Sequence, residues 1–248
     1  MFAIYKKEMR SYFTSPIGYV FIAVFLAVSA ALFSYCTLQA GENSNYASYF
    51  TFMLFVLVIV LPLLTMKLFS EERKTRTEQL LLTAPISLTG MVVGKFLAAF
   101  SIFGATFLLS MLQFVLLVHY GPTGYSADAG DYVSALNTAP IWGTLVAMLL
   151  IGGAFLAIGL FISSLTENQL VAAISTIAIL VALLLISFAN DYIEWGWLRT
   201  IFNWVSVFSR FSNFTSGIFD FAALLYYISM MAVFLFLSVR VFEKRRWE

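Results

Sequence analysis

The chain has 248 residues, of which 61% are hydrophobic and only 11% are charged, and its mean hydropathy is +0.92. Soluble domains are about half apolar and about a quarter charged, so this composition excludes a water-soluble globule and a disordered chain. The net charge of +1 excludes a protein that binds a polyanion such as nucleic acid along its whole length. The single Cys and single His exclude a disulfide framework and most His-based or Cys-based metal chemistry. A polytopic membrane protein remains.

The N-terminal segment, residues 1–16, carries an apolar stripe at helical spacing and ends at Pro16. The stripe consists of Phe2, Tyr5, Met9 and Tyr12. The other face carries the basic residues Lys6, Lys7 and Arg10. This pattern predicts an amphipathic interfacial helix on the cytoplasmic membrane surface. The alternative is an ordinary basic tail that only sets the orientation of the chain.

Six segments are apolar and long enough to cross ~30 Å of hydrocarbon at ~1.5 Å per residue. They cover residues 17–38, 49–66, 91–118, 141–164, 170–189 and 221–241. None contains Asp or Glu, and none alternates as the strands of a membrane β-barrel do. Lys95 and Arg240 lie near span ends, from which we expect them to snorkel to the interface. The expected fold class is all-α, a polytopic bundle of six transmembrane helices.

The basic residues predict the orientation of the chain. Twelve of the 14 fall on one side, around the termini and the connector between the second and third spans. They are Lys6, Lys7, Arg10, Lys67, Arg73, Lys74, Arg76, Lys95, Arg240, Lys244, Arg245 and Arg246. Only Arg199 and Arg210 fall on the other side. The positive-inside rule therefore predicts that both termini are cytoplasmic, in agreement with an even number of spans.

The connector between the second and third spans predicts a short charged helix over residues 70–84. Ser70 is placed to cap it, and Glu71 and Glu72 lie in the first turn, where the helix dipole favours them. Opposite charges recur four residues apart, a spacing that stabilises an exposed helix. These pairs are Glu72–Arg76 and Lys74–Glu78. The apolar tip at residues 80–82 needs a burial partner, unless the segment is a solvated connector.

The segment between the last two spans, residues 190–220, has too many aromatic residues for a loop in water. They are Trp195, Trp197, Phe202, Trp204, Phe208, Phe211, Phe214 and Phe219. Trp195, Trp197, Trp204 and Arg210 mark an outer interfacial or re-entrant segment that dips into the membrane. The alternative is a plain aromatic belt at the outer membrane surface. An earlier outer loop, residues 119–140, is rich in turn-forming residues.

The sequence contains no catalytic constellation and predicts no cofactor in this chain. Residues 90–96 resemble a P-loop but are one residue too short, and Phe96 stands where Ser or Thr must hold magnesium. We interpret His119 as an interfacial histidine and Cys36 as a packed thiol. Ion-coupled carriers place Asp, Glu or His at mid-membrane, and these spans do not. If the protein moves a substrate uphill, the energy would therefore enter through a cytoplasmic partner at the charged helix.

The residues of this connector resemble a motif of the ABC-2-type ABC-transporter permeases. Residues 69–85 read FSEERKTRTEQLLLTAP, followed by Gly94-Lys95. The family pattern is close to E-E-R-x-x-G-T-x-E-x-L-L-x-x-P with a Gly-Lys a few residues later, and the Thr75-Arg76-Thr77 run of this chain departs from its Gly-Thr. Residues 6–16 and the end of the chain also resemble the family, nearest to its gliding-motility and nitrous-oxide-reductase-maturation branch.

The resemblance implies that residues 1–248 form a single transmembrane domain of a bacterial inner-membrane transporter, working in export. Two copies of a separate ABC ATPase would bind ATP and Mg, and this chain would not be an enzyme. The implied ATPase-coupling residues are Glu71, Glu72, Arg73, Glu78, Leu80, Leu82 and Pro85, with Glu167 as a lesser second contact. The first, second and fifth spans would face a second permease copy or a related permease. The similar gliding-type systems suggest a further partner, an auxiliary subunit with a large outer domain, and no nucleic acid is implied.

Two other classes of function stay open. An integral-membrane enzyme acting on lipid would need acidic or His residues at one interface, and the outer candidates are Asp191, Glu194 and Asp220. These residues show no recognisable catalytic spacing. A structural membrane anchor is the second alternative, and deleting the charged helix at 70–84 would separate it from a transporter.

Overall fold

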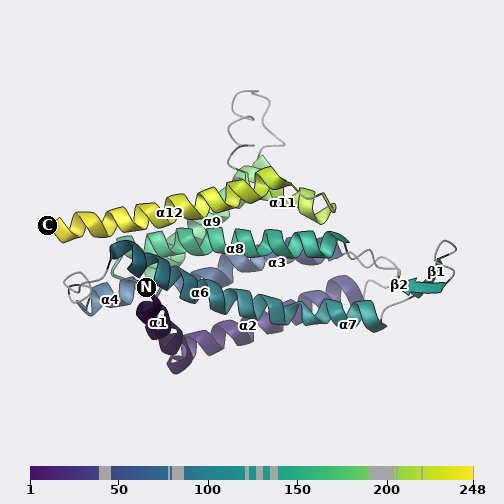
Figure 1. Cartoon of the computed structure of the whole chain (residues 1–248), viewed down its shortest axis with the longest axis horizontal. Coiled ribbons are helices and arrows are strands. Elements are labelled where there is room, and N and C mark those ends of the chain that lie inside the picture. The colour runs from purple at the N-terminus through teal and green to yellow at the C-terminus, as the bar shows by residue number, and fades with distance from the viewer. Residues whose placement is uncertain are drawn as a thin grey trace.

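The structure is a computed structural model of the whole chain, and its described part is almost entirely helical. It describes residues 1–38, 46–77, 79, 87–120, 123–126, 131–134, 139–189, 204, 206–218 and 220–247. The exception to the helical architecture is a two-stranded antiparallel hairpin, in which Thr123 pairs with Ser134. The long helices run side by side, with this hairpin at one end of the bundle and both termini at the other (Figure 1).

Thirteen described elements follow one another along the chain. They are α1 (Phe2–Thr14), α2 (Pro16–Phe33), the π-helical η1 (Ser34–Leu38), α3 (Tyr46–Thr65), α4 (Ser70–Lys74), α6 (Leu88–Ser110), α7 (Leu112–Tyr120), β1 (Thr123–Ser126), β2 (Asp131–Ser134), α8 (Ala139–Leu165), α9 (Gln169–Ala189), α11 (Val207–Thr215) and α12 (Phe221–Trp247). The end of the bundle that carries α4 and both termini is called the α4 end, and the opposite end is called the hairpin end (Figure 1).

Among the described residues, six helical segments are long and apolar enough to cross a membrane, which confirms the predicted fold class. They are Pro16–Thr37, Ala47–Lys74, Leu88–Leu116, Ile141–Leu165, Gln169–Phe188 and Phe221–Arg246. The second and last spans reach further than predicted, because a turn at residues 66–69 carries α3 into α4, and α12 stays helical through charged residues at the α4 end. Pro62 lies inside α3 and does not end it. The protein is thus an all-α, multi-pass membrane protein.

Helix α8 lies at the centre of the bundle. In its most apolar stretch, 72% of the residues are buried inside the protein. Three of its glycines allow close approach, because a Cβ atom at each would collide with a side chain of a different neighbouring helix. Gly152 faces Phe103 of α6, Gly153 faces Met231 of α12, and Gly159 faces Thr65 of α3. Small residues have this role in membrane bundles, where close van der Waals packing holds helices together.

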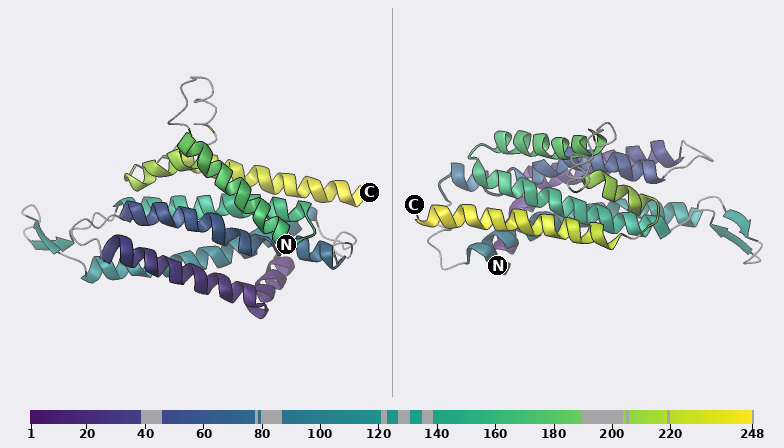
Figure 2. Two further views of the ribbon diagram at one scale, coloured as in Figure 1. Left: turned by 180° about the vertical axis from the view of Figure 1, so that it is seen from behind. Right: turned by 90° about the horizontal axis from the view of Figure 1, so that it is seen from above.

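Helices α2, α3 and α9 lie side by side on one face of the bundle (Figure 2, left). In the most apolar stretches of the α2 and α9 spans, only 28% and 33% of the residues are buried. Large apolar side chains on this face point outward, among them Phe52, Ile59 and Ile174. In a membrane, such a face contacts lipid or another transmembrane helix rather than water.

Candidate functional site

The surface helix α1 packs against the bundle through Ile4, Glu8 and Tyr12, which are its buried residues. The Tyr12 hydroxyl donates to the Leu64 carbonyl at 2.7 Å. Burial and the charge of Glu8 raise the pKa of the Tyr12 hydroxyl well above its ordinary value, so it stays a donor. The predicted apolar stripe is therefore divided between two surroundings, with Tyr12 facing protein while Phe2 is 76% exposed.

The basic residues of α1 also differ from one another. Lys6 and Arg10 are exposed on the outer side of the helix. Lys7 turns toward α4, and its Nζ lies 2.9 Å from Glu72 Oε1 and 3.8 Å from Glu8 Oε1. Burial lowers the pKa of Lys7, but the hydrogen bond and the charge of Glu72 outweigh this, so its pKa is raised. Lys7 is thus a charged link between α1 and α4.

Lys95 is at the centre of a buried group of charges. Its side chain is 1% exposed, and its Nζ lies 2.9 Å from Glu8 Oε1 of α1 and 2.9 Å from Glu72 Oε1 of α4. It also donates to the Leu68 carbonyl at 2.7 Å. The expectation that Lys95 snorkels to the interface is therefore wrong, because its ammonium group forms ion pairs with two carboxylates inside the protein. Lys7, Glu8, Glu72 and Lys95 are called the Lys95 cluster below.

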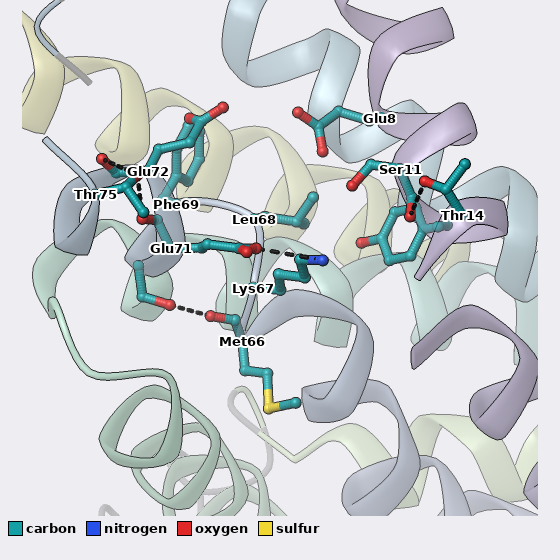
Figure 3. A network of polar contacts seen from close by, with 12 residues as sticks. Glu8, Ser11, Thr14, Met66, Lys67, Leu68, Phe69, Glu71, Glu72 and Thr75 are labelled. Carbon is teal, nitrogen blue, oxygen red and sulfur yellow. Dashed lines mark hydrogen bonds and ion pairs between the residues drawn. The ribbon is translucent and has the colours of Figure 1, made fainter. Parts of the chain in front are cut away.

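A polar cavity of about 230 Å³ opens beside the Lys95 cluster, between α1, α4 and α6. Figure 3 shows Glu8, Leu68 and Glu72 at this place, with the ion pair of Lys67 and Glu71 nearby. The Lys67 Nζ lies 3.4 Å from Glu71 Oε2, and the Glu71 side chain is 41% exposed. Of the two glutamates of α4, Glu72 therefore faces the protein and Glu71 faces outward.

The start of α4 is stabilised by a serine of α8. Ser163 Oγ accepts hydrogen bonds from the backbone N–H groups of Phe69 at 3.2 Å and Ser70 at 3.3 Å. Ser70 lies inside the helix, and its hydroxyl donates to the Met66 carbonyl. The predicted Ser70 cap is therefore wrong, because α3 continues almost directly into α4 and the free N–H groups are met by α8 instead.

Helix α4 ends earlier than predicted, at Lys74, and a turn follows at residues 75–77. Arg76 has φ 57°, and its N–H donates to the Arg73 carbonyl at 3.1 Å. Because this turn breaks the helix, the expected i,i+4 pair of Glu72 and Arg76 does not form. Arg76 occupies the position where the family pattern has glycine, the residue that most readily adopts a positive φ.

The rest of the predicted coupling helix lies outside the described residues, apart from the helical Gln79. Glu78, Leu80, Leu82 and Pro85 belong to this part, as does the Lys74–Glu78 pair. Their place in a coupling helix stays a prediction.

Arg73 joins α4 to the turn between α8 and α9. Its Nε lies 2.9 Å from Glu167 Oε1, and its Nη1 donates to the Leu165 carbonyl at 2.8 Å. Arg245 of α12 donates to the preceding carbonyl, that of Ser164, at 2.6 Å. Cations at a helix C-terminus satisfy its free carbonyl groups and interact favourably with its dipole. The two elements predicted to contact an ATPase, α4 and the Glu167 turn, are therefore in direct contact.

At the other end, α11 is held against α8, α9 and α12 by polar contacts. Thr144 donates to the Phe214 carbonyl at 3.1 Å, and Tyr227 donates to the Val207 carbonyl at 2.9 Å. Phe211 and Phe214 are fully buried, so part of the aromatic segment packs inside the protein. Figure 1 shows α11 beside the start of α12 and short of the hairpin end of α8.

The residues chosen to mark this aromatic segment have different surroundings. Trp204 is 70% exposed, and the Arg210 guanidinium lies 4.5 Å from the centre of the Tyr226 ring. Trp195 and Trp197 lie outside the described residues, as do Asp191 and Glu194. Asp220 caps α12 by accepting from the N–H of Ala222 at 2.9 Å. A re-entrant path of the whole segment stays a prediction.

The described residues contain no group of three His, Cys, Asp or Glu that could hold a metal ion. His119 is exposed on α7, and Cys36 is buried as a free thiol. Sequence reasoning gave Glu8 no role, and it placed Lys95 at the interface instead of in a buried ion pair. The available signal was a lysine inside an apolar span, since such a residue needs a partner.

Comparison with protein families matches residues 28–242 to the ABC-2 family transporter proteins. A comparison with curated proteins finds no match. Membrane components of this family generally work with separate ABC ATPase subunits and typically have neither catalytic activity nor a cofactor of their own. The match agrees with the six spans and with the motif at residues 69–85, while the branch of the family stays a prediction. Because the match covers most of the sequence, the chain belongs to the ABC-2 family of transporter membrane proteins.

Proposed function

We propose that this chain is the permease subunit of an exporter in a bacterial inner membrane, driven by ATP hydrolysis in two copies of a separate subunit. The observation that carries the proposal is the contact of Arg73 with Glu167 and the Leu165 carbonyl. It joins two elements to which the family resemblance gives a part in ATPase coupling, α4 and, as a lesser second contact, the turn at Glu167. Of the family's branches, the motifs favour the gliding-motility and nitrous-oxide-reductase-maturation permeases.

The exposed part of these two elements is the docking site for the ATPase. Glu71 and Glu167 are its accessible carboxylates, with side chains 41% and 63% exposed. Glu72 and Arg73 face inward and hold α4 in position. Glu78, Leu80, Leu82 and Pro85 extend the docking site along the chain, and a groove on the ATPase buries the apolar tip at residues 80–82.

The α4 end is the cytoplasmic end in this proposal. Both termini, α4 and the turn between α8 and α9 lie there together (Figure 1). Twelve of the 14 basic residues also belong to this side of the sequence, and the positive-inside rule places such a side in the cytoplasm. The exposed Lys6 and Arg10 of α1 then lie at the level of the anionic lipid headgroups.

A second permease copy, or a related permease, covers the face formed by α2, α3 and α9. Phe55 of α3 stacks on Phe188 of α9 with ring centres 6.1 Å apart, so this face is continuous across two of its helices. ATP binding closes the two ATPase subunits and displaces both copies of α4. The two six-helix halves shift, and substrate held between them is released outward. An auxiliary subunit with a large outer domain would contact the hairpin end.

The first test is gentle detergent purification of the tagged chain from its native host, followed by mass spectrometry. We expect a stoichiometric partner with a complete P-loop and ATPase activity in the complex. A partnerless chain, under conditions that preserve other membrane complexes, would contradict the proposal. A complex that keeps its partner after deletion of residues 70–84 would favour the anchor alternative.

A further inference from the structure

The Lys95 cluster joins three elements that are distant in the sequence. Lys95 belongs to α6, Glu8 to α1 and Glu72 to α4, and the Lys95 Nζ has three oxygen partners within 2.9 Å. An ammonium group has three N–H donors, so these partners use all of them. Such an arrangement allows little displacement of any one element without loss of a buried hydrogen bond.

The charges of this cluster balance within the protein. Two lysines face two glutamates, and Lys7 bridges the same two carboxylates from the more exposed side. A balanced group leaves no net charge to attract an ion into the neighbouring cavity. The cluster is therefore better suited to hold helices together than to bind a ligand.

Helix α1 is in turn closely attached to the first span. A single residue, Ser15, separates α1 from α2. A Cβ atom at Gly18 in the first turn of α2 would collide with the backbone of Tyr12, so the two helices touch at their junction. Movement of α1 must therefore move the start of α2.

We infer that the Lys95 cluster makes α1 and α4 one mechanical unit, so that a force applied to α4 also moves the membrane-surface helix and the first span. This inference rests on the proposed function, since it assumes that an ATPase applies the force to α4. Lys95 is then a positioning residue that touches neither nucleotide nor substrate. The attachment of α1 to α4 can be measured on the permease itself, whether or not an ATPase binds.

The test uses two spin labels, on Ala3→Cys in α1 and Lys74→Cys in α4, in a Cys36→Ala background. Both labelled positions are exposed, and Cys36 is the only native cysteine. The distance distribution between the labels is measured in the full chain in lipid nanodiscs. The double variant Lys7→Met with Glu8→Gln removes both charged links of α1 and leaves the Lys95–Glu72 pair balanced, so we expect it to fold.

We expect this double variant to broaden the distance distribution about twofold, because α1 loses its charged partners. The matched control is Arg240→Met with Glu243→Gln, which removes one exposed ion pair of α12 and should leave the distribution unchanged. Glu8→Asp keeps the charge but shortens the side chain, and we expect an intermediate width. An unchanged width in the double variant and in Glu8→Asp would overturn the inference.

The same labels separate this inference from the proposed function. With the ATPase bound, ATP should leave the α1–α4 distance unchanged in the wild type and alter it in the double variant. If no ATPase binds the wild type, the proposed function fails. The width of the distance distribution still shows whether α1 is attached to α4. If the ATPase binds but the double variant behaves as the wild type, only the mechanical unit is wrong.

Discussion

The two ends of the bundle are held together by different chemistry. At the α4 end, charged groups form ion pairs with specific partners, as Lys95 does with Glu8 and Glu72. At the hairpin end, aromatic rings pack in a cluster in which Phe114 lies 5.1–5.4 Å from Phe33, Tyr49 and Phe50, measured between ring centres. Ring packing contributes burial in many arrangements, whereas ion pairs need defined positions. The difference indicates that the α4 end requires accurate placement, and the hairpin end mainly requires stability.

The largest expected effect is that of Lys95→Met, which leaves the carboxylates of Glu8 and Glu72 buried without their main partner. Removing one member of a buried ion pair costs about 3–5 kcal/mol. Phe114→Ala at the hairpin end is matched in size, since deleting a buried ring also costs about 3–5 kcal/mol. Both should lower the unfolding midpoint, but only Lys95→Met should increase hydrogen exchange of the α1 amides. Equal exchange in the two variants would remove the distinction between the ends.

A second prediction concerns Glu167→Arg, which places a cation beside Arg73. The Glu167 side chain is 63% exposed, so we expect little change in thermal stability. Binding of the ATPase should weaken about tenfold, equivalent to about 1.4 kcal/mol, because its docking site loses a carboxylate and gains repulsion. Titration of the purified ATPase against the reconstituted permease measures this, with Arg240→Met as the control. Unchanged affinity would exclude the Glu167 turn from the docking site.

Ser163→Ala tests the cap that α8 provides to α4. Loss of the hydroxyl leaves the N–H groups of Phe69 and Ser70 without their acceptor, at a cost of about 1 kcal/mol. We expect faster amide exchange at these two residues and no change at α11. The control is Ser229→Ala, which removes a hydroxyl on an exposed face of α12 and should leave the exchange at Phe69 and Ser70 unchanged. A Ser163→Ala variant with wild-type exchange would show that α3 alone positions α4.

Arg76→Gly is expected to stabilise the α4 end slightly. A non-glycine residue in the left-handed region costs roughly 1 kcal/mol, and glycine does not have this cost. The unfolding midpoint should therefore rise, whereas Thr75→Gly at a negative φ should lower it. A fall in the unfolding midpoint of Arg76→Gly would mean that the arginine side chain stabilises the fold by more than its positive φ destabilises it.

The smallest expected effect is a pH dependence at the start of α12. The hydrogen bond from Asn213 lowers the pKa of Asp220, partial burial raises it, and the N–H groups of Ala223 and Ala222 and the charge of Arg210 lower it further, so that the net shift is downward. Because the pKa is lower in the folded protein, the stabilisation is present above the ordinary Asp pKa of about 3.9 and is lost as the pH falls through the folded value. Proteolysis between α11 and α12 should increase over that range in the wild type, and Asp220→Asn should abolish the dependence.

The spans were predictable from the sequence, and the contacts of the site were not. Apolar runs such as 141–164 identify membrane helices because the bilayer imposes their length and composition. The pairing of Glu8 with Lys95 joins residues 87 positions apart, and nothing in the local pattern of either residue selects the other. The role of Ser163 was likewise hidden, because a serine near the end of an apolar helix has many possible partners. The motif at residues 69–85 indicated a candidate site, but only the packing of α1, α6 and α8 around it identifies what each charge contacts.

The three glycines of α8 restrict how the molecule can change shape. Phe103, Met231 and Thr65 fill the spaces at Gly152, Gly153 and Gly159, so α8 cannot slide along α6, α12 or α3 without emptying them. Shear between packed helices is one of the two common ways in which proteins rearrange, and this packing opposes it. We expect α3, α6, α8 and α12 to turn as a rigid body, so that, in the proposed dimer, the alternation between conformations would take place at the contact between the two copies.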